Sequence, residues 1–329
     1  MMELFIIGSG NRILNDYLPM LKYLQSKNNI KVVGVINRTK KNCEYLLEEF
    51  QCKYFSSIKD LDIKKKQGNF ILSINHTVKD KSVKELIKKN FNIFIDTPLS
   101  KSMRLLRKVS KKNLKISFAE DFFGSPITMK LISLINQNNV NKFEIVNKNF
   151  TTNYHFFSII GQIIRKEMLN CNISSRIDGD KKIVFDKISY GKIIFRSETN
   201  LIKQNNQLEK EFYFSDFKNK NISSKNILDD IIESLISTDD EFFNYLKENI
   251  KTNIDITNSI YLKNKKILKI IGLKNMFTNW INSILNNEEI FLTPKNACEI
   301  LFLLKTASIS RKLNISMNPS KLKLIQYLL

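Results

Sequence analysis

Residues 4–13 of the chain read LFIIGSGNRI, and this stretch decides the fold. The apolar run Leu4–Ile7 leads into Gly8-Ser9-Gly10 and then into a segment with helical spacing. A strand that turns through glycines into a helix is the context of a dinucleotide-binding turn, in which unpaired N–H groups and the helix dipole receive a pyrophosphate. The usual third glycine is Ile13 here, which implies a slightly displaced helix. A plain strand–helix turn is the alternative interpretation.

The residues that follow alternate apolar runs with segments of helical periodicity. Strands are expected at Leu4–Ile7, Val32–Ile36, Phe70–Ile74, Ile93–Ile95 and Ile116–Phe118. Helices are expected near 14–26, 40–50, 78–90 and 101–112. Strands that read as continuous apolar runs and are separated by helices are typical of a parallel sheet with both faces covered. The sequence therefore predicts an α/β protein that begins with a Rossmann-type doubly wound parallel sheet.

After Pro126 the rhythm changes to that of an α+β domain. Helices are expected near 126–137, 154–168, 226–236 and 239–248, and strands near 142–150, 181–187, 190–198 and 209–215. Closely spaced strands with a polar face are typical of a largely antiparallel, open sheet. The sequence predicts a helix over Met276–Asn286 and a last one that runs to about Leu313, with Thr293 as N-cap and Pro294 in the first position.

These patterns divide the chain into three parts. We expect a Rossmann dinucleotide-binding domain over 1–122, an α+β substrate and oligomerisation domain over 123–275, and C-terminal helices over 276–329 that pack back toward the Rossmann domain.

The composition excludes several classes of protein. Among 329 residues there is no apolar run long enough for a transmembrane helix and no basic leader before an apolar core, so a cytoplasmic location is expected. The four cysteines form no CxxC pair and there are only two histidines, so no metal site is expected.

The formal net charge is +21, which is compatible with a polyanionic partner such as nucleic acid. However, lysines are spread over every segment and are accompanied by asparagine-rich loops, as in a compositional bias. We therefore expect no nucleic-acid partner. An electropositive surface that attracts phosphorylated ligands remains an expectation.

The end of the second strand indicates which coenzyme the turn would take. In an NAD site an acidic residue at this point binds the ribose 2′-OH, whereas the sequence here is Asn37-Arg38-Thr39, followed by two lysines. A carboxylate would repel a 2′-phosphate, whereas arginine and threonine would bind one. The pattern predicts a preference for NADP(H) over NAD(H), with a solvated loop arginine as the alternative.

The order of these segments resembles the glucose–fructose oxidoreductase/inositol dehydrogenase family (Gfo/Idh/MocA). The resemblance lies in five segments, FIIGSGNRILNDYLPMLKYL, IKVVGVINRTKKNCEYLLEEF, FILSIN, NFNIFIDTPLSKS and ISFAEDFFGSPITMKLI, and in the C-terminal FTNWINSILNNEEIFLTPKNACEILFLLKTASIS. It covers about residues 1–160 and 276–316. The resemblance implies hydride transfer between a nicotinamide and a carbonyl or alcohol, commonly of a sugar or cyclitol, and a homodimer or homotetramer formed through the open sheet.

The resemblance also implies catalytic positions, and this chain departs from two of them. The family's E-K-P at the end of the fifth strand, whose lysine lies near the reacting oxygen, corresponds to Asp96-Thr97-Pro98. The family's D-x-x-x-H corresponds to the segment from Thr151 to His155. Since reduction of a carbonyl needs a proton donor and the lysine is missing, the candidate catalytic residues are His155, Tyr154 and Thr97. A core or interface histidine is the alternative role for His155.

The residues expected to bind the cofactor come from the ends of the first, second, fourth and fifth strands. They are Gly8, Ser9, Gly10, Asn11, Arg12, Asn37, Arg38, Thr39, Ser73, Asn75, His76, Asp96 and Pro98. The expected function is an NADP(H)-dependent oxidoreductase that acts on a small polar substrate such as a sugar or nucleotide-sugar derivative, phosphorylated substrates included. The alternatives are reduction of an imine, and a degenerate relative that binds a nucleotide without catalysis.

Overall fold

The structure is a computed structural model. It describes residues 1–61, 68–96, 103–120, 123–137, 143–150, 154–164, 170–178, 183–190, 193–200, 211–216, 220–250 and 259–320.

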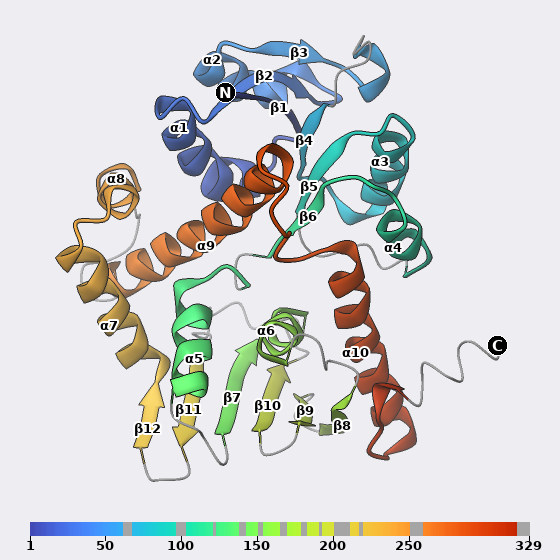
Figure 1. The fold of residues 1–329 in the computed structure, drawn as a ribbon, viewed down its shortest axis with the longest axis vertical. Coiled ribbons are helices and arrows are strands. Elements are labelled where there is room, and N and C mark those ends of the chain that lie inside the picture. Colours follow the sequence, from blue (N-terminus) through green and yellow to red (C-terminus); the bar gives the residue numbers. More distant parts are fainter. Residues whose placement is uncertain are drawn as a thin grey trace. The chain divides into compact units, whose positions relative to one another are not determined.

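The N-terminal sheet has six parallel strands in the order β3-β2-β1-β4-β5-β6 (Figure 1). Its strands are β1 Met2–Ile7, β2 Ile30–Ile36, β3 Lys53–Phe55, β4 Asn69–Leu72, β5 Asn92–Asp96 and β6 Ile116–Ala119. Every pair of neighbours is parallel, and β4, β5 and β6 are buried at every position. The predicted doubly wound sheet is confirmed, whereas β3 was not predicted.

Helices cover both faces of this sheet. Helices α3 His76–Lys88 and α4 Met103–Ser110 lie on one face, and α1 Leu18–Ser26 and α9 Ser259–Leu285 lie on the other (Figure 1). The segment that enters α1 is a π-helical turn over Ile13–Tyr17, in which the Leu18 N–H donates to the Ile13 carbonyl. Helix α2 Glu44–Phe50 follows a 3₁₀ turn over Lys40–Cys43. The chain thus enters α1 by a wider turn than a regular α-helix would give, at the position where the third glycine is replaced.

Helix α9 closes the core next to β5 and β6. The Phe94 ring contacts Phe277 and Trp280 at centroid distances of 5.1 and 5.6 Å, and the Trp280 indole N–H donates to the Lys115 carbonyl at 2.8 Å. The predicted helix at Met276–Asn286 is therefore only the C-terminal part of a helix that begins at Ser259. Its first half carries many lysines, which interrupt the apolar periodicity by which a helix is predicted.

The second sheet also has six strands, in the order β12-β11-β7-β10-β9-β8. The strands are β7 Phe143–Phe150, β8 Asn172–Asp178, β9 Ile183–Tyr190, β10 Ile193–Asn200, β11 Glu211–Asp216 and β12 Lys220–Ser223. Among the described strands of this second sheet, only β7 and β10 pair in parallel. The other neighbours are antiparallel, which confirms the predicted largely antiparallel sheet. Strands β8 and β12 were not predicted.

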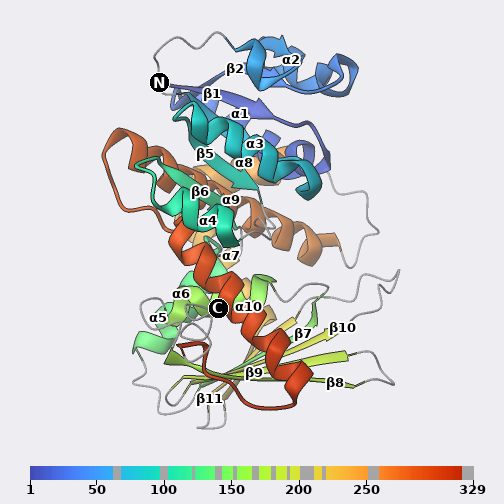
Figure 2. The ribbon, with the colours of Figure 1, turned by 90° about the vertical axis from the view of Figure 1, so that its right-hand side faces the viewer.

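The helices associated with this sheet are α5 Pro126–Gln137, α6 Tyr154–Ile164, α7 Ser224–Ser237 and α10 Pro294–Leu313. Figure 2 shows α5, α6 and α10 on the same side of the sheet. Near the C-terminal end of α10, Arg311 donates to Ser175 of β8 at 3.0 Å, and Ser175 donates to the buried carboxylate of Asp186 at 2.5 Å. The N-cap prediction is confirmed, because the Asn296 N–H donates to Thr293 Oγ1 at 3.2 Å.

The chain forms two compact units. The first contains residues 1–125 and 237–297, and the second contains residues 126–236 and 298–329. Residues 237–275, which include helix α8 Glu241–Asn249, thus lie with the Rossmann sheet, whereas the sequence-based division placed them in the α+β domain. The domain roles assigned from the sequence stay a prediction.

Candidate cofactor site

The turn after β1 needs glycine at its first position. Gly8 has a φ of +102°, in the region that favours glycine, and its N–H donates to the Ile36 carbonyl at 3.0 Å. A Cβ placed on Gly8 would lie 2.0 Å from the Ser73 carbonyl oxygen. The close approach of β1 and β4 and the unusual φ therefore both exclude a side chain here.

The second glycine of the turn, Gly10, differs from Gly8 because its surroundings are open. It is exposed, its φ is not in the left-handed region, and a Cβ built on it would meet nothing within 4 Å. Neither the backbone nor the packing of the protein therefore requires glycine at this position. The open space lies just before the helix, where a pyrophosphate would approach the backbone, so the turn fits a dinucleotide.

The residues predicted to bind the adenosine end of the coenzyme adjoin this turn. The Asn37 side-chain amide donates to Ser9 Oγ at 2.9 Å, and the Tyr45 hydroxyl donates to the Ser9 carbonyl at 3.0 Å. Arg38 and Thr39 follow Asn37 and are exposed. The structure thus joins the end of β2 to the glycine turn, and Asn37 stands where an acidic residue would meet a ribose.

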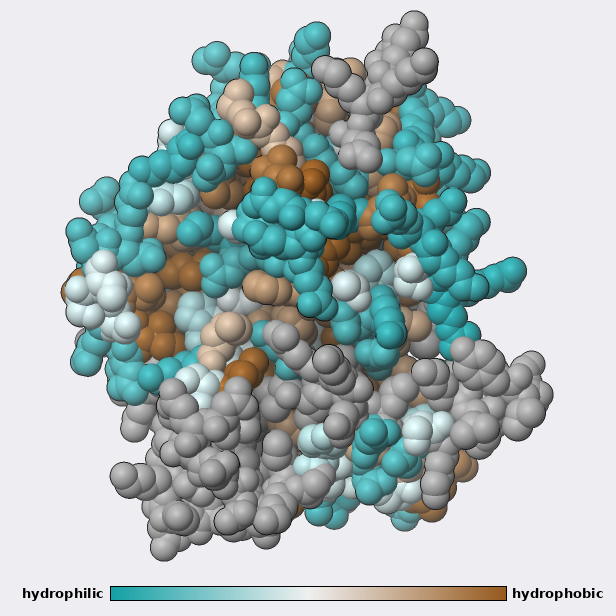
Figure 3. All heavy atoms as spheres, viewed as in Figure 1, coloured by the Kyte–Doolittle hydropathy of each residue, from teal (hydrophilic) through white to brown (hydrophobic). Residues whose placement is uncertain are grey.

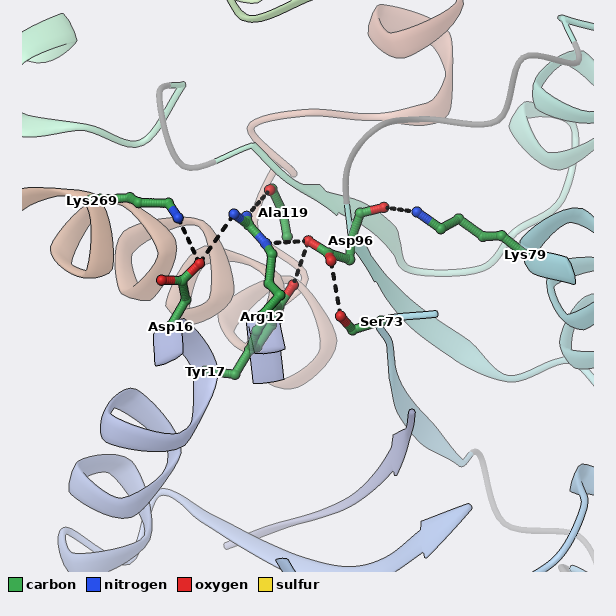
Figure 4. A network of polar contacts seen from close by, with 8 residues as sticks. All are labelled: Arg12, Asp16, Tyr17, Ser73, Lys79, Asp96, Ala119 and Lys269. Carbon is green, nitrogen blue, oxygen red and sulfur yellow. Dashed lines mark hydrogen bonds and ion pairs between the residues drawn. The ribbon is translucent and has the colours of Figure 1, made fainter. Parts of the chain in front are cut away.

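On the other side of the turn, Arg12 reaches the end of β5. Its Nε donates to Asp96 Oδ1 at 2.6 Å, and a terminal nitrogen donates to the Ala119 carbonyl at 3.2 Å (Figure 4). Asp96 is buried and also accepts from Ser73 Oγ at 2.9 Å. Two predicted cofactor residues, Arg12 and Ser73, thus both contact a third, Asp96.

Two further residues hold the network to the helices. Asp16, in the π-helical turn, accepts from Arg12 at 3.3 Å and from Lys269 of α9 at 2.7 Å. The Tyr17 hydroxyl lies 3.4 Å from Asp96 Oδ1. Two carboxylates and two cations therefore alternate along this edge of the sheet, which fixes Arg12 between α9 and β5 (Figure 4).

Most of the remaining predicted site residues lie near the start of a helix or outside the described residues. Asn11 and Asn75 are exposed, and the Asn75 carbonyl accepts the first N–H bonds of α3. The main chain of His76 begins α3, and those of Tyr154 and His155 begin α6. The side chains of these three residues lie outside the described part, as do Thr97 and Pro98 entirely.

Five residues of the site were not found from the sequence: Asp16, Tyr17, Tyr45, Lys79 and Lys269. Lys79 is one of several lysines in the segment HTVKDKSVKELIKK, and nothing in the periodicity separates it from the exposed ones. Lys269 is distant in sequence, and only the packing of α9 brings it to Asp16.

Hydrophilic side chains cover much of the surface of the first unit on the face drawn in Figure 3, with apolar surface between them. None of the helices in the described part combines the length and the apolar character needed to cross a bilayer.

A parallel six-stranded sheet with a glycine turn after β1 defines a Rossmann nucleotide-binding domain. Residues 2–118 match the family model described as "Oxidoreductase family, NAD-binding Rossmann fold" (GFO_IDH_MocA). The predicted resemblance to the Gfo/Idh/MocA family is therefore confirmed over these residues. The sequence matches none of the curated proteins with which it was compared.

Solved structures share the fold over nearly the whole chain. A putative myo-inositol dehydrogenase from Sinorhizobium meliloti 1021 has a TM-score of 0.68 at 11% identity, covering 97% of this chain and 99% of that one. The WlbA dehydrogenase from Bordetella pertussis, in complex with NADH and UDP-GlcNAcA, has a TM-score of 0.68 at 9% identity, covering 96% and 97%. A putative NADPH-dependent oxidoreductase from Desulfitobacterium hafniense has a TM-score of 0.69 at 11% identity, covering 98% of each chain. At these identities the likeness is one of fold.

Proposed function

We propose that the protein is an NADP(H)-dependent oxidoreductase that transfers hydride between the nicotinamide and a carbonyl or alcohol of a small polar substrate. The end of β2 carries the proposal for the coenzyme. Asn37 follows β2, where NAD sites carry an acidic residue, and donates to Ser9; with the exposed Arg38 and Thr39 after it, no carboxylate would oppose a 2′-phosphate there. The exposed Lys40 and Lys41 add positive charge beside it.

The groups that bind the two phosphate parts of the coenzyme would come from two strand ends. The N–H groups of the turn at Gly8–Gly10 would hold the pyrophosphate, and Arg38 and Thr39 would hold the 2′-phosphate. The coenzyme brings the hydride chemistry, and the chain's own residues bind it, orient it and move the proton. We propose His155 for the proton, with Tyr154 or Thr97 as a hydrogen-bond donor to the reacting oxygen, because imidazole titrates near neutrality whereas a threonine hydroxyl is a poor acid.

A sugar or nucleotide-sugar derivative is the proposed substrate. Sugar and polyol dehydrogenases occur among the structures of the same fold, and one of them is a complex with UDP-GlcNAcA. The net charge of +21 favours a substrate that carries phosphate. Threonine at position 97 favours imine reduction as the second candidate, because an already protonated iminium needs less help from an enzyme acid.

Calorimetry with NADPH and NADH tests the coenzyme. We expect NADPH to bind at least about tenfold more tightly, and Arg38→Ala to remove most of that difference, since a charge-assisted hydrogen bond is worth about 1.5–3 kcal/mol. Arg107→Ala, which removes an exposed arginine from α4, is the matched control. Equal affinities for the two coenzymes would contradict the NADP(H) preference.

Turnover of NADPH with a panel of ketosugars, nucleotide sugars and imines tests the reaction. Activity that falls steeply in His155→Ala supports the proposed proton relay, whereas binding without turnover favours the degenerate relative. We also propose a cytoplasmic homodimer or homotetramer, and light scattering at several protein concentrations tests the oligomeric state.

A further inference from the structure

Lys79 is a buried cation at the N-terminal end of α3. Its side chain is 2% exposed, and its Nζ donates to the Asp96 carbonyl oxygen at 2.7 Å (Figure 4). A small apolar pocket adjoins it, lined by Val83, Leu105, Leu106 and Phe118. Removing an ammonium group from water costs several kcal/mol, which a methionine at the same place would avoid. Packing of the pocket therefore does not account for the charge.

The position of the ammonium group accounts for the buried charge of Lys79. Side chains alternate between the two faces of a strand, and Phe94 and Asp96 both point toward the face covered by α1 and α9, where Arg12 binds the Asp96 carboxylate. Lys79 reaches the same residue from the α3 side and binds its main-chain carbonyl. Arg12 and Lys79 approach from opposite directions in Figure 4. One cation thus fixes the side chain of Asp96 and another fixes its backbone.

The carbonyl that Lys79 binds belongs to the peptide bond between Asp96 and Thr97. In an open α/β sheet a dinucleotide lies across the carboxyl ends of the strands at the point where the strand order reverses, which here is between β1 and β4. With the adenosine end at β2, the nicotinamide end falls toward β4 and β5. The orientation of the Asp96–Thr97 peptide therefore bears on the nicotinamide half of the site and not on the adenosine half.

We propose that Lys79 is a positioning residue for the nicotinamide half of the coenzyme site, which it orients by holding the Asp96–Thr97 peptide. The inference rests on the proposed function. The proposal divides the coenzyme site into two halves. The end of β2 and the glycine turn hold the adenosine and pyrophosphate, and Lys79, Asp96 and Arg12 set the geometry of the nicotinamide half.

The test compares two ligands on the same variants. The fragment 2′,5′-ADP reports the adenosine half alone, whereas NADPH reports both halves, and the fluorescence of its bound dihydronicotinamide reports the environment of that ring. The variants are Lys79→Met, which removes the charged donor, and Lys79→Arg, which keeps one. Lys81→Met removes an exposed lysine from the same helix and is the matched control.

We expect Lys79→Met to bind 2′,5′-ADP within about twofold of the unaltered protein and NADPH about tenfold more weakly, because the Asp96 carbonyl then loses the charged donor that fixes it. The emission of bound NADPH should shift toward that of free NADPH, and Lys79→Arg should recover part of that shift. If Lys79→Met does not fold, Lys79→Arg against Lys81→Met gives the decisive comparison: an altered NADPH emission with unchanged 2′,5′-ADP affinity supports the proposal.

Three results would overturn it. Unchanged NADPH affinity and emission in both Lys79 variants would show that the peptide does not need the lysine. An equal loss of affinity for both ligands would show a general structural role. Failure of the unaltered protein to bind either ligand would refute the proposed function as well, and this outcome is distinct from the other two.

Discussion

Arg12 and Asp96 are 84 positions apart in the chain and form an ion pair with an Nε–Oδ1 distance of 2.6 Å. Arg12 belongs to the glycine turn after β1, and Asp96 is the last residue of β5. The pair therefore connects the two ends of the proposed coenzyme site through one buried carboxylate. Because Asp96 is buried, the loss of either partner leaves a polar group in a poorly solvated place.

Replacement of Asp96 by asparagine tests the strength of this link. Asp96→Asn removes the charge that Arg12 and Ser73 bind, and we expect the free energy of unfolding to fall by about 1–3 kcal/mol, because a charged acceptor of hydrogen bonds is lost in a largely buried place. Urea denaturation measures the change. Glu48→Gln, an exposed acid in α2, should change it by less than about 0.5 kcal/mol. Equal effects of the two substitutions would show that the pair does not stabilise the fold.

The two glycines of the turn should respond to alanine in opposite ways. Gly8→Ala combines a left-handed φ with a Cβ placed 2.0 Å from the Ser73 carbonyl oxygen, so a loss of about 2–4 kcal/mol in stability is expected. Gly10→Ala meets open space at an ordinary φ, so stability should change by less than about 1 kcal/mol. Coenzyme affinity in Gly10→Ala should nevertheless drop by about tenfold, or ~1.4 kcal/mol, because the methyl group occupies the space left for the pyrophosphate.

Thermal unfolding and coenzyme calorimetry on both proteins measure this contrast. A Gly10→Ala protein that binds NADPH as well as the unaltered protein would show that the open space at this turn is not the pyrophosphate site. A Gly8→Ala protein of unchanged stability would contradict the close approach of β1 and β4.

The central strands of both sheets could be predicted from the sequence, and three strands at sheet edges could not. Strands such as β4 and β5 are buried on both faces and read as apolar runs. The missed strands β3, β8 and β12 each lie at an edge of their sheet, and edge strands are short or polar in natural sheets. Strand β6 is also at an edge, but it is fully buried, with the core that contains Trp280 beside it, and it was predicted.

The candidate site was predictable where it depends on one local motif. Gly8, Gly10 and the end of β2 follow from the strand–turn–helix pattern and its charges. The partners of Asp96 could not be predicted, because Lys79, Tyr17 and Arg12 meet it only through the strand order of the sheet. Lys269 depends on the packing of a helix more than 250 positions away from Asp16.

Burial of Lys79 should leave a signature in the pH dependence of stability. Burial lowers its pKa below the usual 10.5, and Arg12 adds to the effect while Asp96 and Asp80 oppose it. In the pH range between the lowered pKa and 10.5, the unfolded chain binds more protons at this residue than the folded chain does. This residue's contribution to the free energy of unfolding therefore rises with pH through that range.

The difference between the unaltered protein and Lys79→Met isolates this contribution, because the other lysines and tyrosines titrate in both. The stability of the unaltered protein relative to Lys79→Met should increase as the pH is raised from 7 toward 10.5, as measured by urea denaturation at each pH. A difference that is independent of pH would show that Lys79 is as well solvated in the folded state as in the unfolded chain.

The thiol of Cys52 provides a last, local test of the packing between α2 and β3. Burial raises its pKa to about 11, so at pH 8 its thiolate fraction is roughly 200-fold smaller than that of a free cysteine with a pKa near 8.5. Alkylation of the native protein at pH 8 should therefore be slow at Cys52, and its rate should increase about tenfold per pH unit up to pH 10. Peptide mass spectrometry after timed alkylation measures the rate, with the urea-unfolded protein as the reference. Rapid alkylation of Cys52 at pH 8 would mean that the end of α2 opens to solvent and does not pack stably against the start of β3.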